Sequence, residues 1–239
     1  MQDFGAVMKR FLLCAASTCA ILGATSAIAA DLGARKPVAM AAPVEMFNPW
    51  MVRFRALAVI PEDRSTVHLN GARFAGNNNL SVNNSVVPEL DISYFFTKNF
   101  AVELILGTTP HTVKTANALA GAVPGKVGSA WLLPPTLTAQ YHFYLTDSIK
   151  PYVGAGVNYT FFLDEKQKGS FTAFNMKNTF GLALQAGVDV MIDKHWGFNV
   201  DVKKIFLQPE YRAVVGNVVA TGKAKIDPWL IGAGVTYKF

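Results

Sequence analysis

Eight segments of about ten residues, in which apolar side chains alternate with polar or small ones, limit the possible folds of this chain more than any other feature. They cover residues 50–60, 87–95, 100–107, 133–144, 150–161, 179–192, 196–207 and 228–239. This length and period of two are typical of membrane-crossing strands, whereas a spanning helix needs about 20 consecutive apolar residues. Beyond the N-terminal segment no apolar run approaches that length, although 51% of the residues are hydrophobic. The sequence therefore predicts an all-β protein, a closed eight-stranded antiparallel transmembrane β-barrel.

The N-terminus has the anatomy of a secretory signal peptide. Lys9 and Arg10 precede an apolar run, and small residues follow it up to Ala29 and Ala30, the two expected cleavage positions. A transmembrane helix is the weaker interpretation, because Ser and Thr residues interrupt the apolar run. We therefore divide the chain into a signal peptide (1–30), a flexible periplasmic leader (31–48) and a transmembrane barrel (49–239).

Cysteine content and charge exclude several classes of protein. Cys14 and Cys19 both lie in the expected signal peptide, so the exported chain would have no disulfide framework, thiolate nucleophile or cysteine–metal site. The formal charge of +6 would suit nucleic-acid binding by a soluble protein, but no basic cluster or nucleic-acid motif is present and export opposes it. Basic residues that face lipopolysaccharide, or that line a lumen admitting anions, explain this charge better.

Short and long connections alternate along the chain. The short turns are 97–99, 145–148 and 193–195, and the long connections are 61–86, 108–131, 162–178 and 208–227. In outer-membrane barrels the short turns are periplasmic and the long loops extracellular, so we expect both termini in the periplasm of a bacterium. A soluble β-sandwich would also alternate. It does not explain the aromatic residues near the strand ends or the terminal Phe239, which follows alternating apolar residues.

Five stretches of sequence carry a resemblance to a known family. They are "WMVRFRALAVIP", "PELDISYFFTKNFAVELILGTTPH", "PPTLTAQYHFYLTDSIKPYVGAGVNYTFF", "LALQAGVDVMIDKHWGFNVDVKKI" and "GAGVTYKF". In these residues the chain resembles the OmpW family of small outer-membrane barrels, which includes AlkL-type hydrocarbon importers. The resemblance implies a narrow, largely hydrophobic lumen that passes small apolar molecules, which leave sideways through the wall. It also implies that Tyr237 and Phe239 form a signal read by the outer-membrane assembly machinery.

Ten polar residues fall on the inward parity of the predicted strands. They are Arg53, Arg55, Glu89, Asp91, Glu103, Gln140, His142, Asp189, Asp201 and Lys203. Opposite charges in so narrow a lumen should pair, because an isolated buried charge is very costly. We expect a structural plug toward the periplasmic side rather than direct substrate handling. Asp201 is the expected partner of Arg53 and Arg55, because the first strand neighbours the eighth and the seventh comes next.

If a plug blocks the lower lumen, an apolar solute must leave through the wall. Leu57 and Val59 on the first strand, with Phe162 and Leu163 at the start of the third long connection, are candidates for an apolar funnel at the outer mouth. The alternative is that these residues only cap the barrel.

No enzymatic activity, cofactor or metal is expected. The four histidines, His68, His111, His142 and His195, are scattered, and neither a G-x-S-x-G motif nor a cluster with metal-ligand spacing accompanies them. The expected function is passive uptake of small apolar solutes by a barrel set in outer-membrane lipid and lipopolysaccharide. A structural or surface-interaction barrel without transport is the alternative. The sequence does not name the substrate, because aliphatic lumen residues discriminate weakly among apolar molecules.

Overall fold

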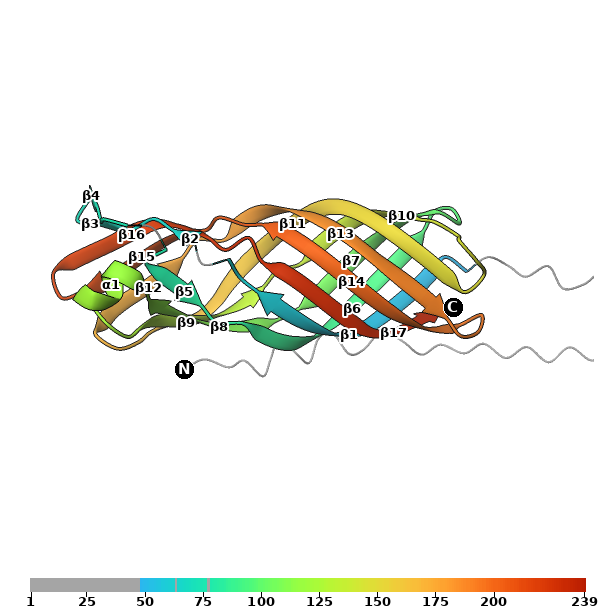
Figure 1. Cartoon of the computed structure of the whole chain (residues 1–239), viewed down its shortest axis with the longest axis horizontal. Helices are drawn as coiled ribbons and strands as arrows, with labels where there is room; N and C mark the ends of the chain where they lie inside the picture. Colours follow the sequence, from blue (N-terminus) through green and yellow to red (C-terminus); the bar gives the residue numbers. More distant parts are fainter. Residues whose placement is uncertain (1–47, 63, 77) are drawn as a thin grey trace, which may run out of the picture. The chain divides into compact units, whose positions relative to one another are not determined.

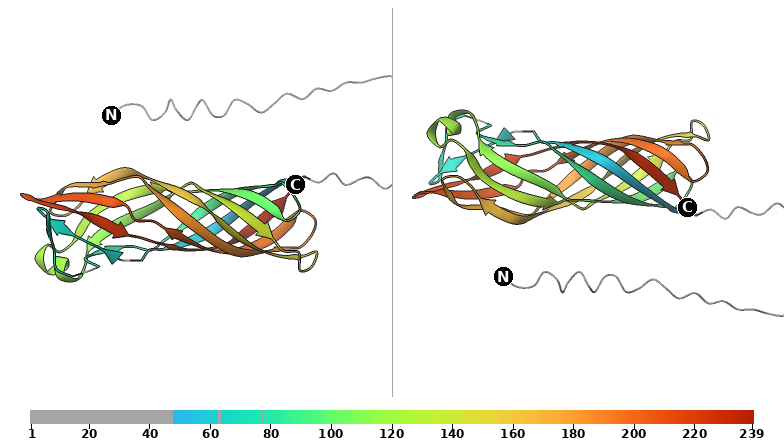
Figure 2. Two further views of the ribbon diagram at one scale, coloured as in Figure 1. Left: turned by 90° about the horizontal axis from the view of Figure 1, so that it is seen from above. Right: turned by 90° about the horizontal axis from the view of Figure 1, so that it is seen from below.

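The computed structural model describes residues 48–239 except 63 and 77, so the expected signal peptide and all but the last residue of the expected leader lie outside the described residues. Eight antiparallel strands close into a barrel (Figures 1 and 2). In order around the wall they are β1 (Trp50–Ile60), β6 (Ser85–Phe95), β7 (Phe100–Gly107), β10 (Thr136–His142), β11 (Ile149–Gln167), β13 (Thr179–Met191), β14 (Trp196–Phe206) and β17 (Trp229–Lys238). β17 pairs with β1, so the predicted closed eight-stranded fold is confirmed.

The alternation of each strand separates a lipid face from a lumen face. Phe54 is 56% exposed on the outside of β1, whereas the next residue, Arg55, is 1% exposed on the inside. Successive side chains of a strand point to opposite faces, and closure leaves no unpaired strand edge in the bilayer. The predicted faces of β1 are therefore confirmed. No helix in the described part of the chain is long and apolar enough to cross a membrane.

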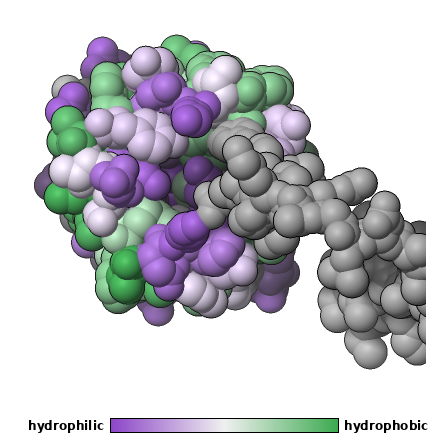
Figure 3. Space-filling model, turned by 90° about the vertical axis from the view of Figure 1, so that its right-hand side faces the viewer, coloured by the Kyte–Doolittle hydropathy of each residue, from purple (hydrophilic) through white to green (hydrophobic). Residues whose placement is uncertain are grey.

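Aromatic residues gather at the barrel end that carries the short turns and the C-terminus. The rings of Trp50 and Tyr94 lie 4.9 Å apart in an edge-on arrangement, and those of Trp196 and Tyr237 lie 4.8 Å apart. Seen end-on from this side, hydrophilic residues occupy much of the visible face and hydrophobic residues lie toward its rim (Figure 3). Aromatic rings with polar edges favour such a boundary between hydrocarbon and water.

The four long connections contain further strands and one short helix at the other end of the barrel (Figure 1). These elements are β2 (Arg64–Ser65), β3 (His68–Leu69), β4 (Ala72–Arg73), β5 (Leu80–Val82), β8 (Thr109–Thr115), α1 (Asn117–Ala122), β9 (Lys126–Leu133), β12 (Phe171–Met176), β15 (Glu210–Val215) and β16 (Val218–Lys225). Strands β8 and β9 continue the wall above β7 and β10, and β9 pairs with the upper part of β11. Gly216 begins the two-residue turn between β15 and β16 at φ 55°, a conformation that glycine adopts without strain.

These elements pack around a second apolar core beyond the barrel. The core includes Val67, Leu80, Val127, Phe174 and Tyr211, all buried. Its members come from all four long connections, which the sequence marked only by length. We call this part of the molecule the cap. Burial of these apolar side chains gives the connections a fixed structure.

Candidate functional site

The lumen has two chemically different halves, divided at one level of the barrel. On five strands the inward side chain changes from polar to apolar within two residues toward the cap. These steps are Arg55 to Leu57 on β1, Glu89 to Val87 on β6, Glu103 to Ile105 on β7, Gln185 to Ala183 on β13 and Lys203 to Ile205 on β14. We call the half next to the short turns the floor and the half next to the cap the upper pocket.

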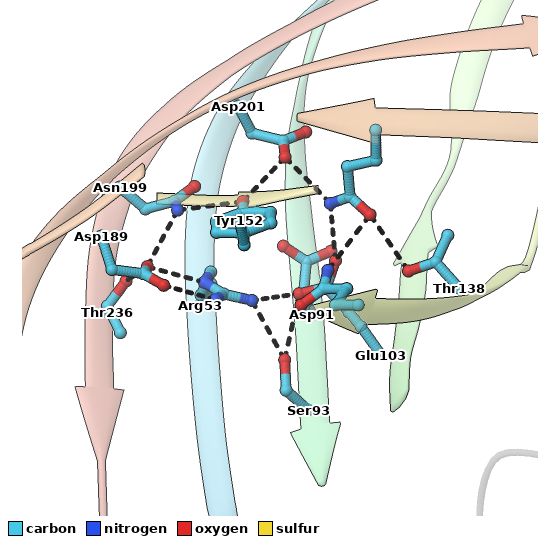
Figure 4. A network of polar contacts seen from close by, with 12 residues as sticks. Arg53, Asp91, Ser93, Glu103, Thr138, Tyr152, Asp189, Asn199, Asp201 and Thr236 are labelled. Atoms are coloured by element: carbon cyan, nitrogen blue, oxygen red, sulfur yellow. Dashed lines mark hydrogen bonds and ion pairs between the residues drawn. The ribbon is translucent and has the colours of Figure 1, made fainter. Parts of the chain in front are cut away.

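All ten residues predicted to point inward lie in the floor. None of them is more than 2% exposed. The structure brings them into one connected network of ion pairs and hydrogen bonds. Figure 4 shows the part of this network around Arg53, Glu103 and Asp189. Residues of this chemistry are rarely buried unless they are paired, and each of the ten has at least one partner within the network.

Arg53 lies at the centre of the first part of the network. Its guanidinium donates to Asp189 through Nε at 3.0 Å and through Nη2 at 2.7 Å, a bidentate arrangement. Its Nη1 forms an ion pair with Glu103 and donates to Ser93 Oγ at 3.0 Å. The guanidinium also lies 4.9 Å from the ring of Tyr152. The Arg53 side chain of β1 thus binds residues of three other strands, β6, β7 and β13.

Arg55 and Lys203 form the second part, directly below the upper pocket. Arg55 donates to Glu89 Oε2 at 3.0 Å and forms an ion pair with Asp91. Lys203 Nζ lies 2.8 Å from Asp201 Oδ1 and 3.2 Å from Glu89 Oε1. Glu89 therefore links the two cations.

The prediction that Asp201 is the main partner of the arginines is wrong. Its carboxylate lies 3.7 Å from Arg55 Nη1, but it accepts shorter hydrogen bonds from Tyr152 at 2.7 Å and Gln185 at 2.9 Å. The reason is the register: β1 places Arg55 directly beside Glu89 of β6, so the arginine meets a nearer carboxylate. Acidic partners do exist for both arginines, as expected.

Several floor residues were not among the predicted site residues. Tyr152, Gln185 and Asn199 are each buried and hydrogen-bonded within the network. All three follow the inward parity of their strands, which is the signal that could have identified them. Gly187 leaves room for the Tyr152 ring, since a Cβ there would lie 2.5 Å from it.

The upper pocket encloses about 880 Å³ of empty space, including its open mouth. Its walls are mainly aliphatic and aromatic side chains of the barrel and cap. Among them are Leu57, Val59, Ile105, Leu132, Phe162 and Ile205. A concave, mostly apolar space with a few polar groups is typical of a binding site for small molecules.

Three of the four residues predicted for an apolar funnel line this pocket. Leu57, Val59 and Phe162 all do. Leu163 does not: it is 47% exposed on the outside of β11. The prediction for Leu163 is wrong because adjacent residues of a strand point to opposite faces, so Phe162 and Leu163 cannot both point inward.

The wall beside the upper pocket is irregular between β6 and β8. Pairing of β6 with β7 ends at Glu89 and Gly107, and pairing of β5 with β8 starts at Val82 and Val113. Between these points two hydrogen bonds join Asn83 and Thr112. The backbone N–H of Asn83 donates to the carbonyl oxygen of Thr112 at 3.4 Å, and the backbone N–H of Thr112 donates to Asn83 Oδ1 at 2.5 Å. Pro88 and Pro110 both lie in this stretch and have no N–H to donate. We call residues 83–88 and 108–112 the seam.

Tyr237 and Phe239 lie at the short-turn end of β17. Their rings are 4.8 Å apart, and Phe239 is 51% exposed on the outer surface. Both side chains therefore belong to the aromatic boundary of the barrel and not to the lumen.

Comparisons with known proteins agree with this architecture. A model of the OmpW family matches residues 49–239. An uncharacterised outer-membrane protein of Sinorhizobium fredii is 50% identical over 235 residues, which cover 96% of this chain and 97% of that protein. The dibenzothiophene metabolism operon protein PahQ of Pseudomonas aeruginosa is 28% identical, over 80% of this chain and 89% of its own length. The crystal structure of OprG from Pseudomonas aeruginosa matches with a TM-score of 0.73 at 29% identity, covering 80% of this chain and 95% of that one.

Proposed function

The chain belongs to the OmpW family of outer-membrane β-barrels, and we propose that it is a passive channel for the uptake of small hydrophobic molecules. The observation that carries this proposal is the upper pocket, an apolar cavity inside a membrane barrel. Water-soluble solutes gain nothing from such a lining, whereas apolar solutes lose their unfavourable contact with water. The relative named for a dibenzothiophene metabolism operon supports a substrate of this class.

The floor sets the route that we propose for the solute. A straight path to the short-turn end would break a network in which Arg53 alone joins Asp189, Glu103 and Ser93. Breaking buried ion pairs for an apolar solute that cannot replace them is very costly. The seam offers a cheaper exit, because few backbone hydrogen bonds have to open there. The proposed path therefore runs from the outer mouth to the upper pocket and then sideways between β6 and β8.

The proposed orientation follows from the two ends of the barrel. The short turns and the C-terminus share one end, which we place in the periplasm with the N-terminus, and the cap faces outward among lipopolysaccharide. In this scheme residues 1–30 direct export and 31–48 form a periplasmic leader. Tyr237 and Phe239, at the end of the last strand, would be the signal for the assembly machinery.

Uptake tests the proposed channel. Whole cells that make the protein should take up a radiolabelled alkane such as decane faster than cells without it. Replacement of Leu57 by Trp should reduce this difference, because the ring would fill the pocket. Ala56→Trp is the matched control, since the adjacent side chain points outward and should leave uptake unchanged. Equal uptake with and without the protein would favour a structural or surface-interaction barrel.

A cross-link tests the sideways exit. Cysteines in place of Asn83 and Thr112 would lie on bonded neighbours across the seam. Oxidation should slow decane uptake and reduction should restore it. If uptake is the same in both states, the solute leaves by another route.

A further inference from the structure

The bottom of the upper pocket is polar. Lys203 and Glu89 are the charged residues that line it, beside the apolar side chains of Leu57, Ile205 and Leu230. Their charged atoms face each other, with Lys203 Nζ 3.2 Å from Glu89 Oε1. The cavity thus has apolar walls and a polar bottom. A pure hydrocarbon matches the walls but cannot form hydrogen bonds at the bottom.

Glu89 keeps some hydrogen-bonding capacity at the bottom of the pocket. The three donors of the Lys203 ammonium face three carboxylate oxygens, Asp201 Oδ1 at 2.8 Å, Glu89 Oε1 at 3.2 Å and Glu89 Oε2 at 3.4 Å. Glu89 Oε2 also accepts from Arg55, whereas Oε1 accepts from Lys203 alone among the described residues. A carboxylate oxygen accepts more than one hydrogen bond. Glu89 Oε1 can therefore accept a further hydrogen bond from a ligand.

The surrounding charges decide which polar end fits. The floor contains five carboxylates, those of Glu89, Asp91, Glu103, Asp189 and Asp201, against three cations, Arg53, Arg55 and Lys203. An anionic ligand would add to this excess of negative charge. A cationic ligand would meet the ammonium of Lys203 at once, and either ion would have to lose its hydration in an apolar cavity. A neutral hydroxyl group, which can donate to Glu89 Oε1, avoids these costs.

One wall carries further polar groups toward the cap. Thr136 of β10 and Thr160 of β11 line the pocket, and both are buried. Each uses its own hydroxyl hydrogen within the wall, Thr136 with Pro134 O at 3.0 Å and Thr160 with Asn158 Oδ1 at 2.8 Å. Their oxygens can still accept a bond from a ligand that donates.

From these groups we propose that the upper pocket selects amphiphiles with one neutral hydroxyl group on an apolar body, and that the hydroxyl end binds at Lys203 and Glu89. Long-chain alcohols are the simplest ligands of this class. This inference rests on the proposed function, because it names the substrates of the same cavity. It predicts that an alcohol binds most tightly and an alkane of equal chain length less tightly. The corresponding carboxylate and ammonium ions should bind most weakly.

Methyl NMR of the protein in lipid nanodiscs tests this order, because it reports on the pocket and not on ligand dissolved in lipid. The ligands are decane, 1-decanol, decanoate and decylammonium, and the reporters are the methyl groups of Leu57, Val59 and Ile205. We expect 1-decanol to bind about tenfold more tightly than decane, because one hydrogen bond to a charged group changes the dissociation constant by about this factor. The C1 protons should show their strongest contacts with Leu57 and Ile205. The terminal methyl group should contact Met176, which lines the pocket at the end of β12 in the cap.

The variant Lys203→Met combined with Glu89→Gln should abolish the preference for 1-decanol while still binding decane. Lys204→Met is the matched control, because this neighbouring lysine pairs with Glu62 outside the pocket, and it should keep the preference. If the double variant does not fold, the affinity order in the unmodified protein is the deciding measurement.

The outcomes separate the two proposals. If none of the four ligands shifts the pocket methyls, the proposed channel is overturned as well. Equal affinities for decane and 1-decanol, or tighter binding of either ion, overturn the hydroxyl preference and leave the channel standing.

Discussion

The floor and the upper pocket share the same eight-stranded wall but are stabilised in opposite ways. In the floor the inward side chains are mostly polar, and specific pairs such as Arg53 with Asp189 fix them. In the upper pocket the inward side chains are mostly apolar, and they line a cavity that opens toward the cap. The comparison shows that one wall can enclose a packed polar network where its inward side chains pair and an open cavity where they are mostly apolar.

The largest expected effect is in the floor. Replacing Arg53 by Met would leave Glu103 and Asp189 buried without their main cation, and we expect a loss of about 3–5 kcal/mol in the free energy of unfolding. Adding Glu103→Gln and Asp189→Asn should recover part of this loss, because the stranded charges are removed. Unfolding in detergent, followed on unboiled gels, measures both. A harmless single substitution would show that the floor is not held by ion pairing.

A matched pair of enlargements compares the packing of the two halves. Gly187→Ala would place a methyl group 2.5 Å from the Tyr152 ring and 2.8 Å from the carbonyl oxygen of Val200, so we expect a loss of about 1–3 kcal/mol. Val59→Ile adds one methyl group to the wall of the upper pocket, where space is available. We expect a change below about 1 kcal/mol. Similar losses for both variants, measured by thermal unfolding, would contradict the difference in packing.

The smallest effect is expected at an exposed ion pair of the cap. Lys177 Nζ lies 2.8 Å from Glu210 Oε2, and this hydrogen bond holds the pKa of Glu210 below its ordinary value. Because the folded-state pKa is depressed, the contribution of the pair is present above the ordinary glutamate pKa and is lost as pH falls through the folded-state pKa. Both side chains are largely solvated, so Glu210→Gln should leave the unfolding midpoint at pH 7 almost unchanged. If Glu210→Gln lowered the unfolding midpoint as much as Arg53→Met, exposure would not explain the difference between the Lys177–Glu210 pair and the buried pairs of Arg53.

The positions of the barrel strands and their faces were predictable from the sequence. Alternation marked 100–107 and 196–207 as strands, and β7 and β14 occupy Phe100–Gly107 and Trp196–Phe206. The end of the fifth strand was less predictable, because β11 continues to Gln167 where the sequence suggested an end near 161. The extension pairs with β9, and such pairing between distant segments leaves no local signal.

The partners inside the lumen were predictable only as a group. Inward parity collected Arg53, Arg55 and their acidic neighbours, but the expectation for Asp201 failed because it assumed that adjacent strands on one side decide the pairing. The closed wall instead carries Arg53 across to Glu103 of β7 and Asp189 of β13. Leu163 failed for a simpler reason, since the alternation that worked elsewhere excludes it from the side of Phe162.

The sequence by itself determined the number of barrel strands and the alternation of their faces, because a period of two is a local property that neighbouring residues impose on one another. The family was indicated separately, by the five stretches that resemble OmpW proteins. Only the tertiary structure decided which charges meet, where the lumen changes from polar to apolar and that the long connections form a cap. These features depend on the stagger of all eight strands around the closed wall and on contacts between residues far apart in the chain.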